Sequence, residues 1–269
     1  MGSVSAITTC MPIKLCANLT MMFQTHDLAR RTALAAQAGF RGIEVLFPYQ
    51  ELEGTAFREV LDEHHLTPVL INAAGGAWTA AERGIGALPK RQAEFREAFD
   101  HALDYANTIG CKNIHVMAGL VPDGADDAPY WDAFCENLSY ASVCAAAAGV
   151  TVLIEPLNTK IDMPRYLLHS SADALWVLEH VASPNLMLQY DLYHMHIMEN
   201  GARADALEPL LPQIGHIQLA DHPGRNEPGS GEIGFDALLP ALEQMGYQGW
   251  IGCEYHEKHG LNWAKPWLG

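Results

Sequence analysis

The sequence has 269 residues, of which 49% are apolar and 18% are charged. This balance is typical of a globular protein and excludes a disordered or fibrous chain, and the length suits a single α/β barrel domain. The 32 acidic and 16 basic residues give a formal charge of −16, which opposes binding to nucleic acid or to anionic membranes. No run of about 18 apolar residues indicates a membrane span.

The start of the chain carries no sign of a targeting segment. Residues 1–11 lack the basic and apolar regions of a signal peptide, so we expect a disordered tail, followed by a single domain over residues 12–269. The six cysteines show no C-x-x-C spacing. They are typical of reduced core thiols, which favours a cytoplasmic protein.

The first half of the domain alternates between strand and helix patterns. A helix is expected to begin near Thr25 or Asp27, which are capping residues, and to end at Gly39. The predicted strands are 13–19, 41–48, 67–73 and 113–119, and the predicted helices are 25–39, 51–65, 90–110 and 129–149. The glycine-rich connection 73–89 is long, and we expect it to be functional.

The second half continues the alternation through four more strands. They are predicted at 151–158, 185–191, 214–221 and 249–255, with helices that include 171–181 and 235–246. Eight such units without a long break favour a single closed (β/α)8 TIM barrel over an open doubly wound sheet. An open sheet would also favour a G-x-G-x-x-G turn after the first strand, and A-N-L-T-M-M-F has none.

Each of these last four strands delivers one oxygen ligand near its carboxyl end. The residues are Glu155, Asp191, Gln218 and Glu254, separated by 36, 27 and 36 residues, the length of consecutive βα units. A single acid at a strand end is often only a helix cap or an ion-pair partner. Four at consecutive strands predict a metal site, and oxygen ligands without a thiolate prefer Mg²⁺ or Mn²⁺.

Several motifs make the sequence resemble the hydroxypyruvate isomerase group of the xylose isomerase-like TIM barrels, which includes 2-oxo-tetronate isomerases. The motifs are A-N-L-T-M-M-F, G-F-R-G-I-E-V-L-F-P-Y, E-R-G-I-G-A-L-P, I-E-P-L-N, Y-D-L-Y-H-M, G-H-I-Q-L-A-D-H-P-G-R-N-E-P-G-S-G-E-I and G-C-E-Y. The resemblance implies that the same four residues hold the metal and that Glu155 and Glu254 are the catalytic acid/base pair. It implies isomerisation of a small anionic hydroxy-oxo acid through an enediolate, with no nucleotide cofactor.

Four further residues are candidates for substrate binding. His194 could bond a substrate oxygen, as the resemblance favours, and Arg225, in the loop after the seventh strand, could bind the substrate carboxylate. Arg83, beside Glu82 on the long loop, is a similar candidate. Glu44 is expected to contact the substrate or to support the ligands.

Three other functions are rivals to this interpretation. A ketose 3-epimerase would use the same metal site, but related epimerases carry histidine where this chain has Gln218. A DNA-repair endonuclease on this barrel would require more histidine ligands near the strand ends and a basic groove, and the sequence shows neither. A non-catalytic metal-binding barrel would not need both glutamates. A homo-oligomer is compatible with the sequence, which marks no interface.

Overall fold

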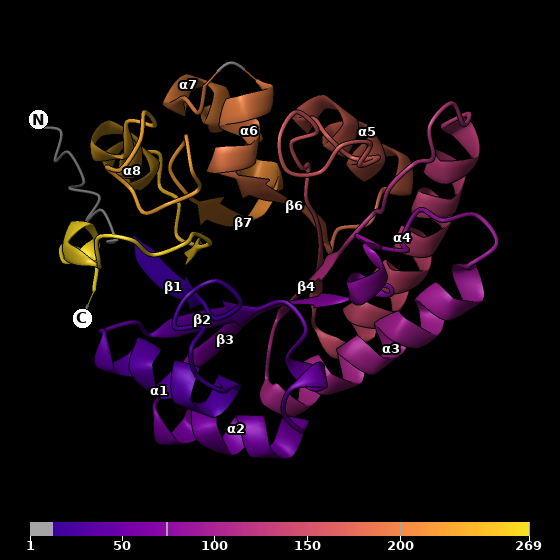
Figure 1. Ribbon diagram of the computed structural model, residues 1–269. Coiled ribbons are helices and arrows are strands. Elements are labelled where there is room, and N and C mark those ends of the chain that lie inside the picture. The colour runs from indigo at the N-terminus through magenta and orange to yellow at the C-terminus, as the bar shows by residue number, and fades with distance from the viewer. Residues whose placement is uncertain (1–12, 74, 200, 269) are drawn as a thin grey trace, which may run out of the picture.

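The computed structural model describes residues 13–73, 75–199 and 201–268. Within these ranges eight strands form a closed barrel in sequence order, because β1 also pairs with β8. All neighbouring strands are parallel, and helices surround the strands (Figure 1). The predicted (β/α)8 barrel is therefore confirmed, whereas the predicted tail at residues 1–11 lies outside the described residues.

The barrel elements follow one another in alternation. The strands are β1 Lys14–Asn18, β2 Gly42–Val45, β3 Thr67–Ala73, β4 Asn113–Val116, β5 Thr151–Ile154, β6 Leu186–Asp191, β7 Ile214–Leu219 and β8 Trp250–Cys253. The helices are α1 Leu28–Gln37, α2 Gly54–Glu63, α3 Gln92–Ile109, α4 Ala128–Ala148, α5 Ser171–Val181, α6 Leu192–Met198, α7 Ala204–Leu207 and α8 Phe235–Gln244.

The outer helices are placed by capping and by apolar periodicity. The side chain of Asp27 accepts a hydrogen bond from Arg30 N and starts α1, as predicted. In α3 the residues Phe95, Phe99 and Ala102 recur at helical spacing and are buried. These faces pack on the strands, so the larger of two hydrophobic clusters contains residues from both the helices and the strands.

The smaller cluster fills the amino-terminal end of the barrel interior. It consists of Cys16, Val69, Leu70 and Leu153, with Met187 and Trp250 packed against it. Cys16, Leu70 and Met187 each come two residues before a polar residue on the same face of their strand, so the inward polar side chains lie nearer the carboxyl end.

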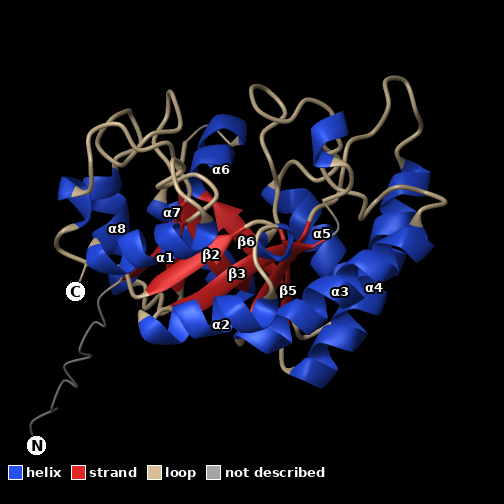
Figure 2. Ribbon diagram, turned by 60° about the horizontal axis from the view of Figure 1, so that its bottom comes forward, coloured by secondary structure: helices blue, strands red, loops and turns tan. Residues whose placement is uncertain are grey.

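The longer connections all follow strands. The helix-to-strand connections 38–41, 64–66 and 110–112 are short, whereas the strand-to-helix connections 74–91 and 155–170 are long. Figure 2 shows long loops gathered at one end of the barrel. A barrel of this kind carries its active site at that end.

Two further observations concern the class of protein. No helix in the described part of the chain is both long and apolar enough to cross a membrane. The thiols of Cys16, Cys111 and Cys253 are buried and free of disulfides.

Candidate metal and substrate site

Three acidic side chains meet at the carboxyl end of the barrel. Glu155 follows β5, Asp191 ends β6 and Glu254 follows β8. One oxygen of each, together with a ring nitrogen of His194, lies within 4.8 Å of all the others. All four side chains are buried. The structure thus brings three of the four predicted ligands together, with the predicted substrate residue His194 beside them.

The fourth predicted ligand, Gln218, lies next to this acidic group. Gln189 Nε2 donates to Gln218 Oε1 at 2.5 Å and to Glu155 Oε2 at 2.9 Å. Because one nitrogen reaches both oxygens, the amide oxygen of Gln218 is close to the Glu155 carboxylate. The amide nitrogen of Gln218 donates to Glu44 instead.

The oxygens of the acidic group fit a divalent cation. Glu155 Oε1 and Asp191 Oδ2 are buried and have no hydrogen-bond partner among the described residues. A buried carboxylate oxygen without a partner is costly. A cation held here would satisfy both oxygens, and the predominantly oxygen donor set favours Mg²⁺ or Mn²⁺.

Burial and mutual repulsion set the protonation of the acids. Burial, reinforced by the charges of Glu254 and Asp191, raises the pKa of Glu155 well above its usual range. Burial also raises the pKa of Asp191, although Arg225 opposes this. For Glu254, burial outweighs the opposing charge of Arg225 and raises the pKa to about 8. Without a cation, burial and mutual repulsion therefore favour the protonated forms of these acids, and Glu254 keeps its proton near neutral pH.

Arg225 supplies a positive charge beside the acids. Its Nη2 donates to Glu254 Oε2 at 2.6 Å, and its Nη1 lies 3.4 Å from Asp162 Oδ2. The guanidinium also lies over the ring of Tyr193 at 5.3 Å. The Nε atom of Arg225 is buried without a partner among the described residues. This donor is available to an anionic group in the site.

His194 is oriented by the loop that follows β5. Its Nδ1 accepts a hydrogen bond from Asn158 N at 3.2 Å. Burial, with the nearby charge of Arg225, lowers the pKa of His194 well below its usual range, so the ring is neutral. A neutral ring that accepts at Nδ1 carries its proton at Nε2. The geometry therefore supports a donor to a substrate oxygen.

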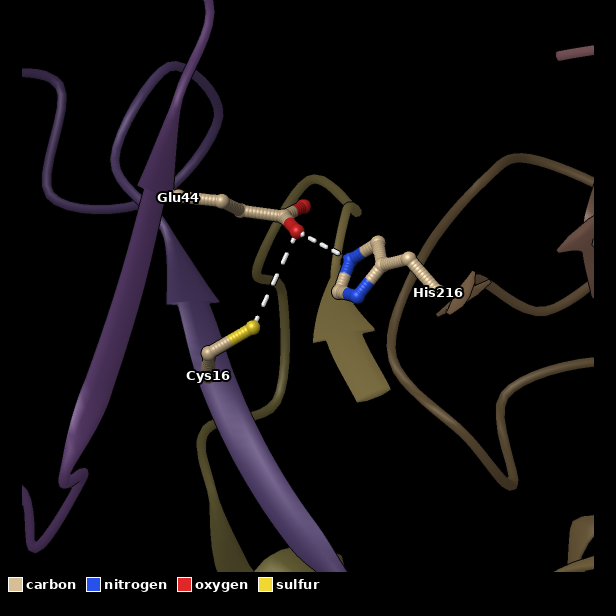
Figure 3. A group of neighbouring side chains, drawn as sticks. All are labelled: Cys16, Glu44 and His216. Atoms are coloured by element: carbon tan, nitrogen blue, oxygen red, sulfur yellow. Dashed lines mark hydrogen bonds and ion pairs between the residues drawn. The ribbon is translucent and has the colours of Figure 1, made fainter. Parts of the chain in front are cut away.

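Glu44 lies beneath the acidic group and is enclosed by donors. Figure 3 shows its carboxylate between Cys16 and His216, with His216 Nε2 at 2.7 Å and Cys16 Sγ at 3.7 Å from Oε2. Asn18 Nδ2 and Gln218 Nε2 each donate to Oε1 at 2.8 Å. Glu44 is almost fully buried and does not line the cavity described below. It therefore acts on the site through its neighbours.

Two features connect Glu44 to the strands around it. Asn18 Nδ2 also donates to Glu254 Oε1 at 3.2 Å, so this amide joins the Glu44 carboxylate to the acidic group. Gly252 leaves the space that the carboxylate fills, since a Cβ there would lie 2.3 Å from Glu44 Oε2. As expected, His216 is a packed and hydrogen-bonded core histidine.

Arg83 lies at the edge of the site, on the long loop after β3. Its guanidinium stacks over Trp78 at 4.5 Å and donates to Glu82 O at 2.8 Å. Trp78 lines the cavity, so Arg83 supports the cavity wall. The carboxylate of Glu82 is bound by Arg91 and Ala77 N within the loop.

A cavity of about 230 Å³ opens above the acidic group. Its polar lining includes Glu155, His194, Arg225 and Glu254 on one side. The remaining lining residues are Thr20, Met21, Leu46, Asn72, Trp78, His115, Met117, Leu157, Met163 and His256. The size suits a small metabolite.

Sequence reasoning did not identify His115 and Asn72 as site residues. They are inward-facing register partners on β4 and β3. The available signal was one polar residue within each of the apolar strand patterns N-I-H-V and V-L-I-N-A. His115 Nδ1 lies 3.6 Å from Glu155 Oε2, and burial lowers the pKa of His115 to about 3.

Comparison with known proteins identifies the family. The family model described as a xylose isomerase-like TIM barrel matches residues 32–268. The chain belongs to this family. The 2-oxo-tetronate isomerase of Cupriavidus necator is 46% identical to this chain, in an alignment that covers 95% of this chain and 99% of the relative. The hydroxypyruvate isomerase of Escherichia coli is 38% identical, in an alignment that covers 95% of this chain and 99% of the relative. The resemblance to the hydroxypyruvate isomerase group is confirmed, and the chain belongs with these isomerases.

Solved structures extend the comparison of the fold. The structure of an AP endonuclease, family 2, from Brucella melitensis has a TM-score of 0.92 and 40% identity, covering 96% of this chain and 100% of that one. D-psicose 3-epimerase from Clostridium cellulolyticum H10 has a TM-score of 0.78 and 18% identity, covering 92% and 86%. The epimerase shares the xylose isomerase-like fold, and at this identity the likeness shows nothing more.

Proposed function

We propose that the protein is a metal-dependent isomerase of small hydroxy-oxo acids. The substrate is hydroxypyruvate, converted to tartronate semialdehyde, or 2-oxo-tetronate, converted to 3-oxo-tetronate. The observation that carries the proposal is the meeting of Glu155 and Glu254, each with a raised pKa, beside Asp191. Both glutamates line one small cavity together with Arg225. The named relatives that cover nearly the whole chain include isomerases of both acids.

The two glutamates would move the proton between neighbouring carbons. One removes a proton from the carbon that bears the hydroxyl group, and the C–H electron pair forms the double bond of an enediolate. The same glutamate, or the other one, returns a proton to the former carbonyl carbon. The hydroxyl proton passes to the former carbonyl oxygen, so the hydroxyl-bearing carbon becomes the carbonyl and the former carbonyl becomes the hydroxyl group.

The remaining residues would bind and orient the substrate. A Mg²⁺ or Mn²⁺ ion held by Glu155, Asp191, Gln218 and Glu254 would act as a Lewis acid that makes the transferred proton acidic. The unpaired Nε of Arg225 would bind the substrate carboxylate. His194 would donate from Nε2 to a substrate oxygen.

The proposal favours an acid over a neutral sugar because of this arginine. An anionic substrate entering a chain of charge −16 requires a local positive centre, and Arg225 lies in the cavity wall. This chemistry requires no nucleotide cofactor. The free buried thiols support work in a reducing compartment, so we propose a cytoplasmic location.

Proton NMR with a substrate panel tests the proposal. Enzyme loaded with Mg²⁺ or Mn²⁺ is incubated with hydroxypyruvate, with 2-oxo-tetronate and with a neutral ketose such as D-fructose. We expect conversion of at least one acid, no change in the ketose, and loss of activity in a chelator that is reversed by the metal. Turnover of the ketose alone, or full activity in the chelator, would contradict the proposal.

Substitution of the two glutamates tests their roles in the same assay. Glu155→Gln and Glu254→Gln should each lower the rate by about 10²- to 10⁴-fold, because each removes a proton-transfer group. The melting temperature should stay near that of the wild type. Glu179→Gln, on the exposed face of α5, is the matched control and should leave the rate unchanged. Near-normal rates in both active-site variants would refute the roles and favour a non-catalytic barrel.

A further inference from the structure

His115 is a buried side chain that faces the cavity without a partner. It is 1% exposed, and neither Nδ1 nor Nε2 has a hydrogen-bond partner among the described residues. The nearest acid, Glu155 Oε2, is 3.6 Å from Nδ1, which is too long for a direct hydrogen bond. Buried polar groups are nearly always paired, so an exception in a ligand cavity points to a ligand.

The position of His115 in the barrel separates it from Arg225. It belongs to β4, whereas Arg225 follows β7, three strands away in a closed barrel of eight. The lining on the side of β1 to β4 is largely apolar, with Met21, Leu46 and Met117. Thr20 Oγ1 there already accepts a hydrogen bond from Leu46 N. Within the strands β1 to β4, His115 and its register partner Asn72 are the polar residues that line the cavity.

The two substrates named above differ in what they would place there. With the carboxylate at Arg225 and the reacting carbons at Glu155 and Glu254, hydroxypyruvate has no further atoms, because its reacting carbon is its last. A four-carbon 2-oxo-tetronate continues for one hydroxymethyl group. We propose that His115, with Asn72 beside it, binds this terminal hydroxyl group, so that the enzyme prefers the four-carbon acid.

The inference rests on the proposed isomerase function and deepens it. A site built to bond a hydroxyl group discriminates strongly against an analogue that lacks it, because the buried group of the site then stays unpaired. Hydroxypyruvate would leave His115 in this state. The imidazole can donate from one nitrogen and accept at the other, which matches a hydroxyl group.

A pair of unreactive acids isolates the terminal hydroxyl group. Threonate and 2,3-dihydroxybutanoate both have four carbons and differ only in this group. Titration of each into the Mg²⁺-loaded enzyme by calorimetry should show threonate binding roughly 10- to 100-fold more tightly. Equal affinities in the wild type would overturn the inference, and this measurement requires no variant to fold.

Variants of His115 then assign the effect to this residue. In His115→Leu, threonate and 2,3-dihydroxybutanoate should bind with equal affinity. In His115→Gln, part of the difference in affinity should return, since the amide can donate and accept. His180→Leu, on the exposed end of α5, is the matched control and should keep the full difference. If His115→Leu weakens both inhibitors equally, the residue only supports Glu155 and the inference is wrong.

Measurements of turnover distinguish a failure of this inference from a failure of the proposed isomerase function. The wild type should show a higher kcat/KM for 2-oxo-tetronate than for hydroxypyruvate, and His115→Leu should lower the first selectively. Turnover of hydroxypyruvate with no preference for the longer acid would overturn the inference and leave the isomerase function intact. Turnover of neither acid would overturn both.

Discussion

Glu44 shows how one buried residue can set the geometry of a site that it does not enter. Its two oxygens accept from Asn18, Gln218 and His216, with Cys16 at 3.7 Å. An amide that donates to Glu44 must turn its oxygen elsewhere. Glu44 thus fixes which end of Gln218 faces Gln189 and Glu155.

Glu44→Gln should therefore damage the site without entering it. A glutamine replaces one acceptor oxygen with a donor, which faces at least one of the existing donors. We expect a loss of about 1–3 kcal/mol in the free energy of unfolding and weaker binding of Mn²⁺, measured by chemical denaturation and calorimetry. Glu59→Gln on the exposed face of α2 controls for the charge change. Unchanged Mn²⁺ affinity in Glu44→Gln would show that the carboxylate does not orient the ligands.

The sequence could predict some of these residues and not others. Glu155, Asp191 and Glu254 could be predicted to lie together because a carboxylate that ends an apolar strand is conspicuous, and parallel strands end at one edge. Asn18 and His115 lie within strands, and their contacts depend on how far neighbouring strands are staggered. Asn18 meets Glu254 across 236 residues of sequence, which no local pattern records.

At the scale of elements, the connection from β7 to α8 is organised by a single aspartate. Asp221 Oδ2 accepts from Gly229 N and Gly231 N at 2.8 and 2.9 Å, and Oδ1 accepts from Ile233 N at 2.9 Å. Gly231 packs so closely that a Cβ would lie 2.1 Å from His222 O. The loop that presents Arg225 is thus held by a fully buried carboxylate.

Asp221→Asn should make this loop less ordered and should therefore weaken substrate binding. Asparagine keeps one acceptor oxygen, so some of the backbone donors lose their partner. We expect a loss of about 1–3 kcal/mol in the free energy of unfolding and a higher KM, because Arg225 is less well placed, measured by denaturation and steady-state kinetics. Asp236→Asn, exposed on α8, is the control. A KM equal to that of the wild type would show that the hydrogen bonds of Asp221 do not determine the position of Arg225.

Most elements were predictable, and the differences follow from physical causes. The strand 67–73 and the helix 171–181 match the structure residue for residue, since each has clear periodicity and clear ends. The predicted strand 151–158 ends earlier, at Ile154, because the chain leaves the sheet to present Glu155. After β6 the chain forms the short helices α6 and α7, whose N-cap residues are Asp191 and Arg203. The sequence has no long amphipathic pattern there that would predict these two helices.

At the scale of the whole molecule, charge bears on the rival function. One similar structure carries the name of an AP endonuclease. A formal charge of −16 opposes the approach of DNA, whose binding depends on neutralising phosphates. The same charge is compatible with a small acid, because Arg225 lies in the cavity wall.

The whole-molecule prediction concerns pH and metal removal. In the metal-free protein, Glu254 has a pKa of about 8 against an ordinary value of 4.5, and the pKa values of Glu155 and Asp191 are also raised. At pH values between the ordinary and the raised pKa of each acid, that acid binds more protons in the folded state than in the unfolded state. Below about pH 6.5 the lowered pKa values of His115 and His194 oppose this trend, so stability should fall clearly only as pH rises from about 7 to about 8. Differential scanning fluorimetry should show this fall in the melting temperature.

Bound metal should reverse the trend, because the cation replaces the protons that the three carboxylates otherwise keep. The affinity for Mg²⁺ or Mn²⁺ should rise with pH up to about 8, by about tenfold per pH unit for each proton displaced. Glu254→Gln removes one titrating group and should flatten both curves. A melting temperature of the metal-free protein that is constant or rises from about pH 7 to about pH 8 would mean that the acids are already paired, and the case for a cation among them would fail.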